Sequence, residues 1–215
     1  MVVEDFPEPE LRLDYFGQGS GTYAGFDRFG RVKDQLWRDY GAPADLDRYA
    51  YAHDRNSNRL YRENSVAPAK DELYAYDRLN RLTMLHRGEL NDEKDAIPVG
   101  DRIKGEAWTL SPVGNWDNFW FDANGDGDFT DAEDLSQTRT HNLANEISDI
   151  TEQQQPPQTQ WATPVMDAHG NMTSLPKPAA LASSLTATYD SWNRLVEVKD
   201  GEAVIQKNEC NCASA

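Results

Sequence analysis

Cysteine, long apolar runs and targeting features are nearly missing from this sequence. The two cysteines, Cys210 and Cys212, are separated by one residue, a spacing too short for an ordinary disulfide that staples a fold. No stretch of apolar residues approaches the length of a membrane span. The first ten residues are acidic, whereas a signal peptide begins basic and then turns apolar, so the chain shows no targeting signal.

Positive charge is also scarce. Lysine and arginine together number 21 against 37 aspartates and glutamates, which gives a formal net charge of −16. This acidic excess repels phosphate backbones, so it argues against nucleic acid as a partner and favours cationic partners or divalent metals. The mean hydropathy of −0.79 indicates a surface-rich, thin-walled molecule rather than a compact globule.

What the sequence does contain is a repeat. Residues 76–82 read Tyr-Asp-Arg-Leu-Asn-Arg-Leu, and the same spacing returns in residues 26–32, 166–172 and 189–195. The shared pattern is a large apolar or aromatic residue, Asp, two variable residues, Gly or Asn, a polar residue and an aliphatic one. Three looser copies bring the total to about seven units: residues 53–60, interpreted with one extra residue, 110–116 and 141–147.

Each unit is typical of a β-hairpin. Apolar residues fall at every second position on both sides of a polar centre, which is the period of half-buried strands. The centre is a predicted turn, because Asp and Asn side chains bond the turn backbone. Gly and Asn alternate in one position, which predicts positive φ there. The predicted turn residues are Asp27, Gly30, Asp54, Asp77, Asn80, Gly114, Asn142, Asp167, Gly170, Asp190 and Asn193.

The Tyr-Asp dipeptide followed by Gly or Asn, Arg and an aliphatic residue resembles the YD repeat of Rhs proteins. Gly-Asn-Trp at 114–116, Arg-Thr-His-Asn at 139–142 and Tyr-Asp-Ser-Trp-Asn-Arg-Leu at 189–195 carry the same resemblance, which covers residues 22–200. It implies an all-β fold, a repetitive antiparallel hairpin sheet that forms part of a spiralling shell. In complete family members such a shell encloses a toxin or other C-terminal cargo.

Three segments follow from this interpretation. Residues 1–21, rich in glycine and serine towards their end, are predicted to be a flexible N-terminal segment. Residues 22–200 form the repeat region, and residues 201–215 are a tail that stops where a further strand and another unit are expected. The expected partners are the remaining repeats of a longer parent chain and an encapsulated C-terminal domain. By the resemblance, the expected location is extracellular or at the cell surface.

Residues 122–133 interrupt the repeat and match the formula of the twelve-residue calcium loop. Acidic side chains so close together repel one another unless a hard cation neutralises them. The flanks are strand-like, so we expect the loop in a β-hairpin, and the alternative is a solvated turn held by Asx bonds. The predicted calcium ligands are Asp122, Asn124, Asp126 and Glu133 through side chains, Asp128 through its carbonyl and Thr130 through water.

Two functions remain open, neither catalytic. The four histidines show no metal-ligand spacing and no accompanying nucleophile motif, so they do not predict an enzyme. The leading hypothesis is a structural segment of an Rhs-type shell or scaffold. The alternative is a carbohydrate-binding module that uses aromatics such as Tyr49, Tyr51 and Trp120, although cross-strand packing is the simpler interpretation of the two tyrosines.

Overall fold

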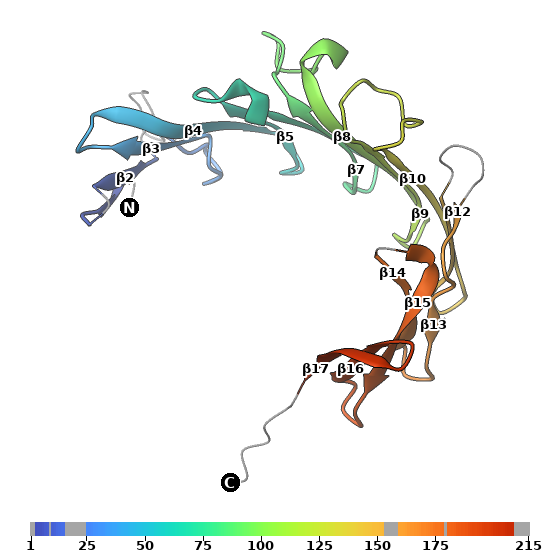
Figure 1. The fold of residues 1–215 in the computed structure, drawn as a ribbon. Helices are drawn as coiled ribbons and strands as arrows, with labels where there is room; N and C mark the ends of the chain where they lie inside the picture. Colours follow the sequence, from blue (N-terminus) through green and yellow to red (C-terminus); the bar gives the residue numbers. More distant parts are fainter. Residues whose placement is uncertain (1–2, 9, 16–24, 153–158, 179, 209–215) are drawn as a thin grey trace. The chain divides into compact units, whose positions relative to one another are not determined.

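The computed structural model describes residues 3–8, 10–15, 25–152, 159–178 and 180–208. Almost all of the secondary structure in these residues is antiparallel β-strand, which confirms the predicted all-β class (Figure 1). Two short 3-10 helices, η1 (Pro68–Lys70) and η2 (Val99–Asp101), interrupt the connections. Neither they nor any other described segment forms a helix with the length and apolarity needed to cross a bilayer.

The strands vary in length from two to ten residues. They are β1 (Val3–Phe6), β2 (Leu11–Asp14), β3 (Asp34–Asp39), β4 (Ala44–His53), β5 (Arg59–Asn64), β6 (Glu72–Tyr76), β7 (Leu82–Gly88), β8 (Arg102–Leu110), β9 (Trp116–Asp122), β10 (Leu135–His141), β11 (Ile147–Glu152), β12 (Thr159–Gln160), β13 (Val165–Met166), β14 (Met172–Lys177), β15 (Ala180–Tyr189), β16 (Leu195–Asp200) and β17 (Ala203–Lys207).

Strand order in the sheets is the order of the sequence, with β1 to β12 in one sheet and β13 to β17 in another. Within each sheet, every interior strand therefore pairs with the strands just before and just after it, and each edge strand pairs with one neighbour. The chain divides into two compact units, the first made of residues 1–108 and 121–128 and the second of residues 109–120 and 129–215.

Few apolar side chains are buried in either unit. Among the described residues these are Leu13, Leu36 and Ile97 in the first unit, and Ile150, Leu185, Ala187 and Val198 in the second. Most strand residues are only half-buried. The sheets must therefore draw much of their stability from cross-strand side-chain pairs and from the turns that set strand register.

Seven turns among the described residues share one design. In each, the N–H of the fourth residue bonds the first residue's carbonyl at 3.0–3.2 Å, and the first residue's N–H bonds the fifth residue's carbonyl at 2.8–3.0 Å. This is a type I turn closed by a bulge, a common hairpin connection. The turns span residues 27–31, 54–58, 77–81, 111–115, 142–146, 167–171 and 190–194.

The side chain of the first turn residue holds the turn together. In six of the seven turns its Oδ1 accepts the N–H of the third residue at 2.8–2.9 Å and that of the fifth at 2.9–3.0 Å. Ser111 fills this role in the remaining turn, where its Oγ accepts the N–H of Asn115 at 3.0 Å. These are Asx-type bonds, for which Asp, Asn and Ser are suited.

The fourth turn residue has positive φ in every case, between 59° and 96°. It is Gly30, Ser57, Asn80, Gly114, Asn145, Gly170 or Asn193. Ser57 is the unexpected member of this set. The extra residue that the sequence pattern predicts within residues 53–60 is wrong, because the Asp54 side chain accepts the N–H groups of Asn56 and Asn58 with the usual spacing.

Four of the six successive pairs of turns are tied to each other by side-chain hydrogen bonds. The fifth residue of one turn donates to the fourth residue of the next: Arg31 to Ser57 at 3.1 Å, Asn58 to Asn80 at 2.9 Å, Asn115 to Asn145 at 3.1 Å and Asn171 to Asn193 at 2.9 Å. We call this row of bonds the turn ladder. In the turn before Gly170, the fifth residue is Glu146, whose ionised side chain can accept hydrogen bonds but cannot donate them. A side-chain acceptor at position 170 would therefore find no donor there.

The segment 1–21 differs from its prediction as a flexible segment. The strands β1 and β2 lie within it, and the side chain of Leu13 is buried. The strand β1 pairs with β2, and β2 pairs with β3, so both belong to the sheet of the first unit. In the tail 201–215, the strand β17 pairs with β16, and Cys210 and Cys212 lie outside the described residues.

Substitutions of Gly30 test whether the turn requires positive φ at its fourth residue. A Cβ at this position would meet nothing within 4 Å, so any cost of substitution comes from φ and not from a clash. We expect Gly30→Val to lower the free energy of unfolding by about 1 to 3 kcal/mol, because a β-branched residue is strained at positive φ. Gly30→Asn is expected to be nearly neutral, as Asn occupies this position in sister turns. Equal losses in urea denaturation would contradict the assignment.

The turn ladder can be measured with a double-mutant cycle on Asn171 and Asn193. The variants are Asn171→Ala, Asn193→Gly and the double variant, where Gly keeps the positive φ while removing the acceptor. We expect a coupling free energy on the order of 0.5 to 1 kcal/mol, the usual net contribution of one hydrogen bond. A control cycle of Asn171→Ala with Asn145→Gly is expected to be additive. Additivity in both cycles would show that the ladder carries no energy.

Candidate functional site

Hydrogen bonds and ion pairs stabilise the ionised carboxylates of the turn aspartates. Partial burial works to raise the pKa of Asp27, but the N–H and guanidinium of Arg31 outweigh it and lower the pKa to about 2. Hydrogen bonds from Arg194 and from Asn171 likewise lower the pKa values of Asp190 and Asp167. These side chains are acceptors committed to the turn and not groups poised for proton transfer.

The same turns point their third residue into solvent. Phe29, Leu79 and Trp192 occupy this position and are 67%, 64% and 71% exposed. The Arg28 guanidinium lies 4.7 Å from the centre of the Phe29 ring, and that of Arg194 lies 5.1 Å from the Trp192 ring. These tips were not among the candidate binding residues predicted from the sequence, although an apolar residue inside a polar turn was the visible signal.

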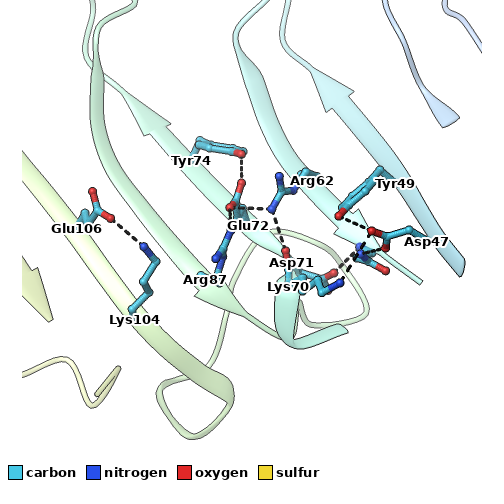
Figure 2. Close-up of polar contacts among 11 residues, drawn as sticks. Asp47, Tyr49, Arg62, Lys70, Asp71, Glu72, Tyr74, Arg87, Lys104 and Glu106 are labelled. Atoms are coloured by element: carbon cyan, nitrogen blue, oxygen red, sulfur yellow. Dashed lines mark hydrogen bonds and ion pairs between the residues drawn. The ribbon is translucent and has the colours of Figure 1, made fainter. Parts of the chain in front are cut away.

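One face of the first unit carries a network of ion pairs and aromatic rings, shown in Figure 2. Glu72 on β6 lies opposite Arg62 on β5 and Arg87 on β7, and its Oε1 is 2.8 and 2.6 Å from their guanidinium nitrogens. The hydroxyl of Tyr74 donates to Glu72. Burial, and then this bond, raise the pKa of Tyr74 to about 12. The register thus places each charge beside its partner.

Tyr49 and Tyr51, which the carbohydrate-binding alternative would use, belong to this network. The Arg62 guanidinium lies 5.0 Å from the Tyr49 ring centre, and that of Arg59 lies 4.8 Å from the Tyr51 ring centre. The Tyr49 hydroxyl donates to Asp47 at 2.7 Å. Both rings are half-buried and in cation–π contact, so sugar stacking there would have to displace an arginine.

Trp120, the third predicted platform residue, lies in the second unit. Its ring is tilted against Phe129, with the ring centres 6.5 Å apart. Trp116 stacks on Phe119 at 5.6 Å and carries Arg139 above its ring at 5.0 Å. Aromatic residues of β9 therefore pack on side chains near them in the hairpin.

The acidic loop follows β9, and its first half lies in the first unit. Asp122 is fully buried, and its carboxylate accepts the N–H of Gly125 at 2.5 Å and that of Gly127 at 2.9 Å. Asn124 and Asp126 accept the N–H groups of Asp126 and Asp128 at 3.0 and 2.8 Å. The predicted ligand oxygens of this half are therefore engaged in successive Asx bonds.

The second half of the loop, from Phe129, lies in the second unit. Thr130 and Glu133 are exposed, while the carboxylate of buried Asp134 accepts the N–H of Asp131 at 3.2 Å. Within the described residues, no three His, Cys, Asp or Glu side chains gather closely enough to hold a metal ion. The oxygen-only donor set suits a hard cation, and calcium binding stays a prediction.

The four histidines of the described residues lie on different elements, which are β4 for His53, β7 for His86, β10 for His141 and the turn 167–171 for His169. Burial, and then the nearby arginines, lower the pKa of His53 and of His86. His53 and His141 directly precede turns, in the position that Tyr76 and Tyr189 fill in sister repeats. Both histidines thus stand where the repeat has an aromatic residue.

The turn carboxylates predict a defined pH dependence, tested with Asp27→Asn. The folded pKa of Asp27 lies near 2 and below the unfolded value of about 3.9, so its ionisation stabilises the fold above pH 4. That contribution is lost as pH falls through the folded pKa. We expect the variant to melt below the parent at pH 7, with the difference vanishing towards pH 2. An NMR titration placing this carboxyl near pH 4 would contradict the prediction.

Comparison with solved structures finds the same fold in parts of much larger toxin chains. The chain is similar to a chain of the Photorhabdus luminescens Tc holotoxin pore carrying a TccC3 mutation, with a TM-score of 0.59, 12% identity and 91% of this chain covered. It is also similar to chains of the TcdB2-TccC3-Cdc42 and TcdB2-TccC3 crystal structures, each at 13% identity and 90% coverage, with TM-scores of 0.58 and 0.57.

The likeness is one of fold. No protein-family model matches the chain, and no curated protein matches its sequence. In each of the three structures the matched region makes up only 9% of the toxin chain. This chain therefore has the fold of a small segment of those Tc toxin chains.

Proposed function

We propose that this chain is a non-catalytic wall or scaffold segment of an Rhs-type shell protein, secreted or at the cell surface. Strand order equal to sequence order, with one turn design repeated seven times, is the observation that carries the proposal. Such a sheet can be lengthened hairpin by hairpin without altering the pairs already made. The partners would then be further repeats of a longer chain and an enclosed C-terminal domain.

The contacts of the polar and aromatic side chains support a role as a wall segment rather than as a ligand-binding site. The turn carboxylates, the Glu72 network and the tyrosine rings are engaged by neighbouring side chains or backbone groups. A catalytic or ligand site normally leaves convergent polar groups available in a concave pocket. The match to segments of Tc toxin chains over nine-tenths of this chain supports the same role.

A sugar titration separates the wall from the carbohydrate-binding alternative. Trp192 is 71% exposed and serves as a fluorescent reporter alongside the other tryptophans. We expect no saturable change in tryptophan emission on adding a panel of oligosaccharides. A saturable change that is lost in Trp120→Ala but kept in Trp192→Ala would overturn the wall proposal. The adjoining reading frame gives a second check, because a wall segment predicts further Tyr-Asp units beside it.

Calcium in the loop 122–133 is part of the same proposal and rests on the loop formula. Bound there, calcium would neutralise adjoining carboxylates and rigidify the connection between β9 and β10. Asp122, Asn124, Asp126 and Glu133 would supply side-chain oxygens. Since Asp122 already holds two backbone amides, Asp122→Ala would also damage the ion-free loop, so Glu133→Gln is the cleaner variant.

We expect calcium in excess to raise the melting temperature, because a ligand that binds only the folded state stabilises it. At a hundred times the dissociation constant the gain is about 2.7 kcal/mol. Glu133→Gln is expected to abolish the gain, whereas Glu202→Gln, an exposed acid in the β16–β17 connection, leaves it intact. Magnesium is expected to stabilise less, because it demands a stricter octahedral geometry. No calcium-dependent shift by calorimetry would leave the solvated Asx turn as the correct interpretation.

A further inference from the structure

The strands of the first unit end on two opposite sides of the sheet, and the connections on the two sides differ. We call these two rows of strand ends the turn edge and the loop edge. The turn edge consists of turns 27–31, 54–58 and 77–81. The loop edge consists of the connections β3–β4, β5–β6 and β7–β8, which are residues 40–43, 65–71 and 89–101. Both edges repeat every second strand, so successive turns and successive loops are each about 10 Å apart.

The turn edge carries exposed positive charge, although the chain as a whole is acidic. Arg28, Arg55 and Arg78 are the second residues of three successive turns, and all three are exposed. None forms an ion pair with any carboxylate of the described residues. The exposed Phe29 and Leu79 stand beside them, so the edge presents a row of guanidinium groups with apolar tips.

A row of arginines at the second position of successive turns occurs in the first unit and not in the second. The second residues of the turns in the second unit carry no positive charge, although the turn geometry is the same. They are Pro112, Leu143, Ala168 and Ser191. The arginines are therefore not a requirement of the turn.

The loop edge has the opposite character. Its longest connection, residues 89–101, exposes five acidic side chains, none of them in an ion pair within the described residues; they are Glu89, Asp92, Glu93, Asp95 and Asp101. Lys94, the basic residue of this loop, is paired with Glu63 of β5. Val66 and Val99 are exposed on the same edge, at 43% and 52%.

We propose that the turn edge of one copy of this chain docks on the loop edge of a second copy. The unpaired arginines meet the unpaired carboxylates of residues 89–101, and the apolar tips meet the valines. The contact is head-to-tail, so it leaves a free edge of each kind and can be extended. It does not depend on the proposed shell role, because it follows from the edges of one unit.

The test is sedimentation of the purified full chain at about 0.1 M salt, where charges more than about 10 Å apart are screened and contact pairs persist. We expect the average mass to rise with concentration over about 1 to 200 µM, the range of weak interfaces. The turn-edge variant Arg28→Glu/Arg55→Glu/Arg78→Glu and the loop-edge variant Glu89→Lys/Asp92→Lys/Glu93→Lys are each expected to associate at least about ten-fold more weakly.

Mixing the two variants is the decisive step. The reversed turn edge of one is then complementary to the reversed loop edge of the other, so we expect association to return to within about three-fold of the parent. A control variant with the same net charge as the turn-edge variant carries its reversals in the second unit and is expected to associate like the parent; it is Lys177→Glu/Lys199→Glu/Lys207→Glu. A monomeric parent, no recovery on mixing, or equal loss in the control would overturn the proposal.

Discussion

The hydrogen bonds that two backbone N–H groups donate to one short side chain set the geometry of six of the seven repeated turns. The Oδ1 atom of Asp77, for example, accepts the N–H groups of Leu79 and Arg81 and so fixes a five-residue loop with positive φ at Asn80. Since a one-residue slip in register would turn each side chain to the other face, this bond also decides which residues meet across the strands. The Glu72 network exists only because the register brings Arg62 and Arg87 to its two sides.

A sheet with few buried apolar residues needs another source of cohesion. In the first unit that source is a set of short-range electrostatic contacts, in which partly buried arginines lie over tyrosine rings or pair with the buried carboxylate of Glu72. Such contacts gain strength from partial burial while avoiding the full desolvation cost of a deep core. They also explain how a chain with a net charge of −16 tolerates its acidic excess, because many of its carboxylates are paired locally.

The turns were readable from the sequence because they depend on local chemistry. Asp followed three residues later by Gly or Asn predicts a turn with positive φ, and the φ values at Gly30, Asn80, Gly170 and Asn193 lie between 59° and 81°. Ser57 could not be found this way, since serine has no strong preference for that region and is held there by its neighbours. The strands within residues 1–21 were missed because four-residue strands have little periodicity to detect. The turn ladder and the Glu72 network depend on which strands become neighbours, which local pattern alone does not state.

The turn ladder also bears on how the chain folds. Its bonds join residues only 22 to 30 positions apart, and every strand pair is between consecutive strands. Proteins dominated by such sequence-local contacts close small loops and fold faster than sheets with distant pairings. Each hairpin can thus form as soon as it leaves the ribosome and offer the next one a finished edge, so that growth of the sheet follows the direction of synthesis.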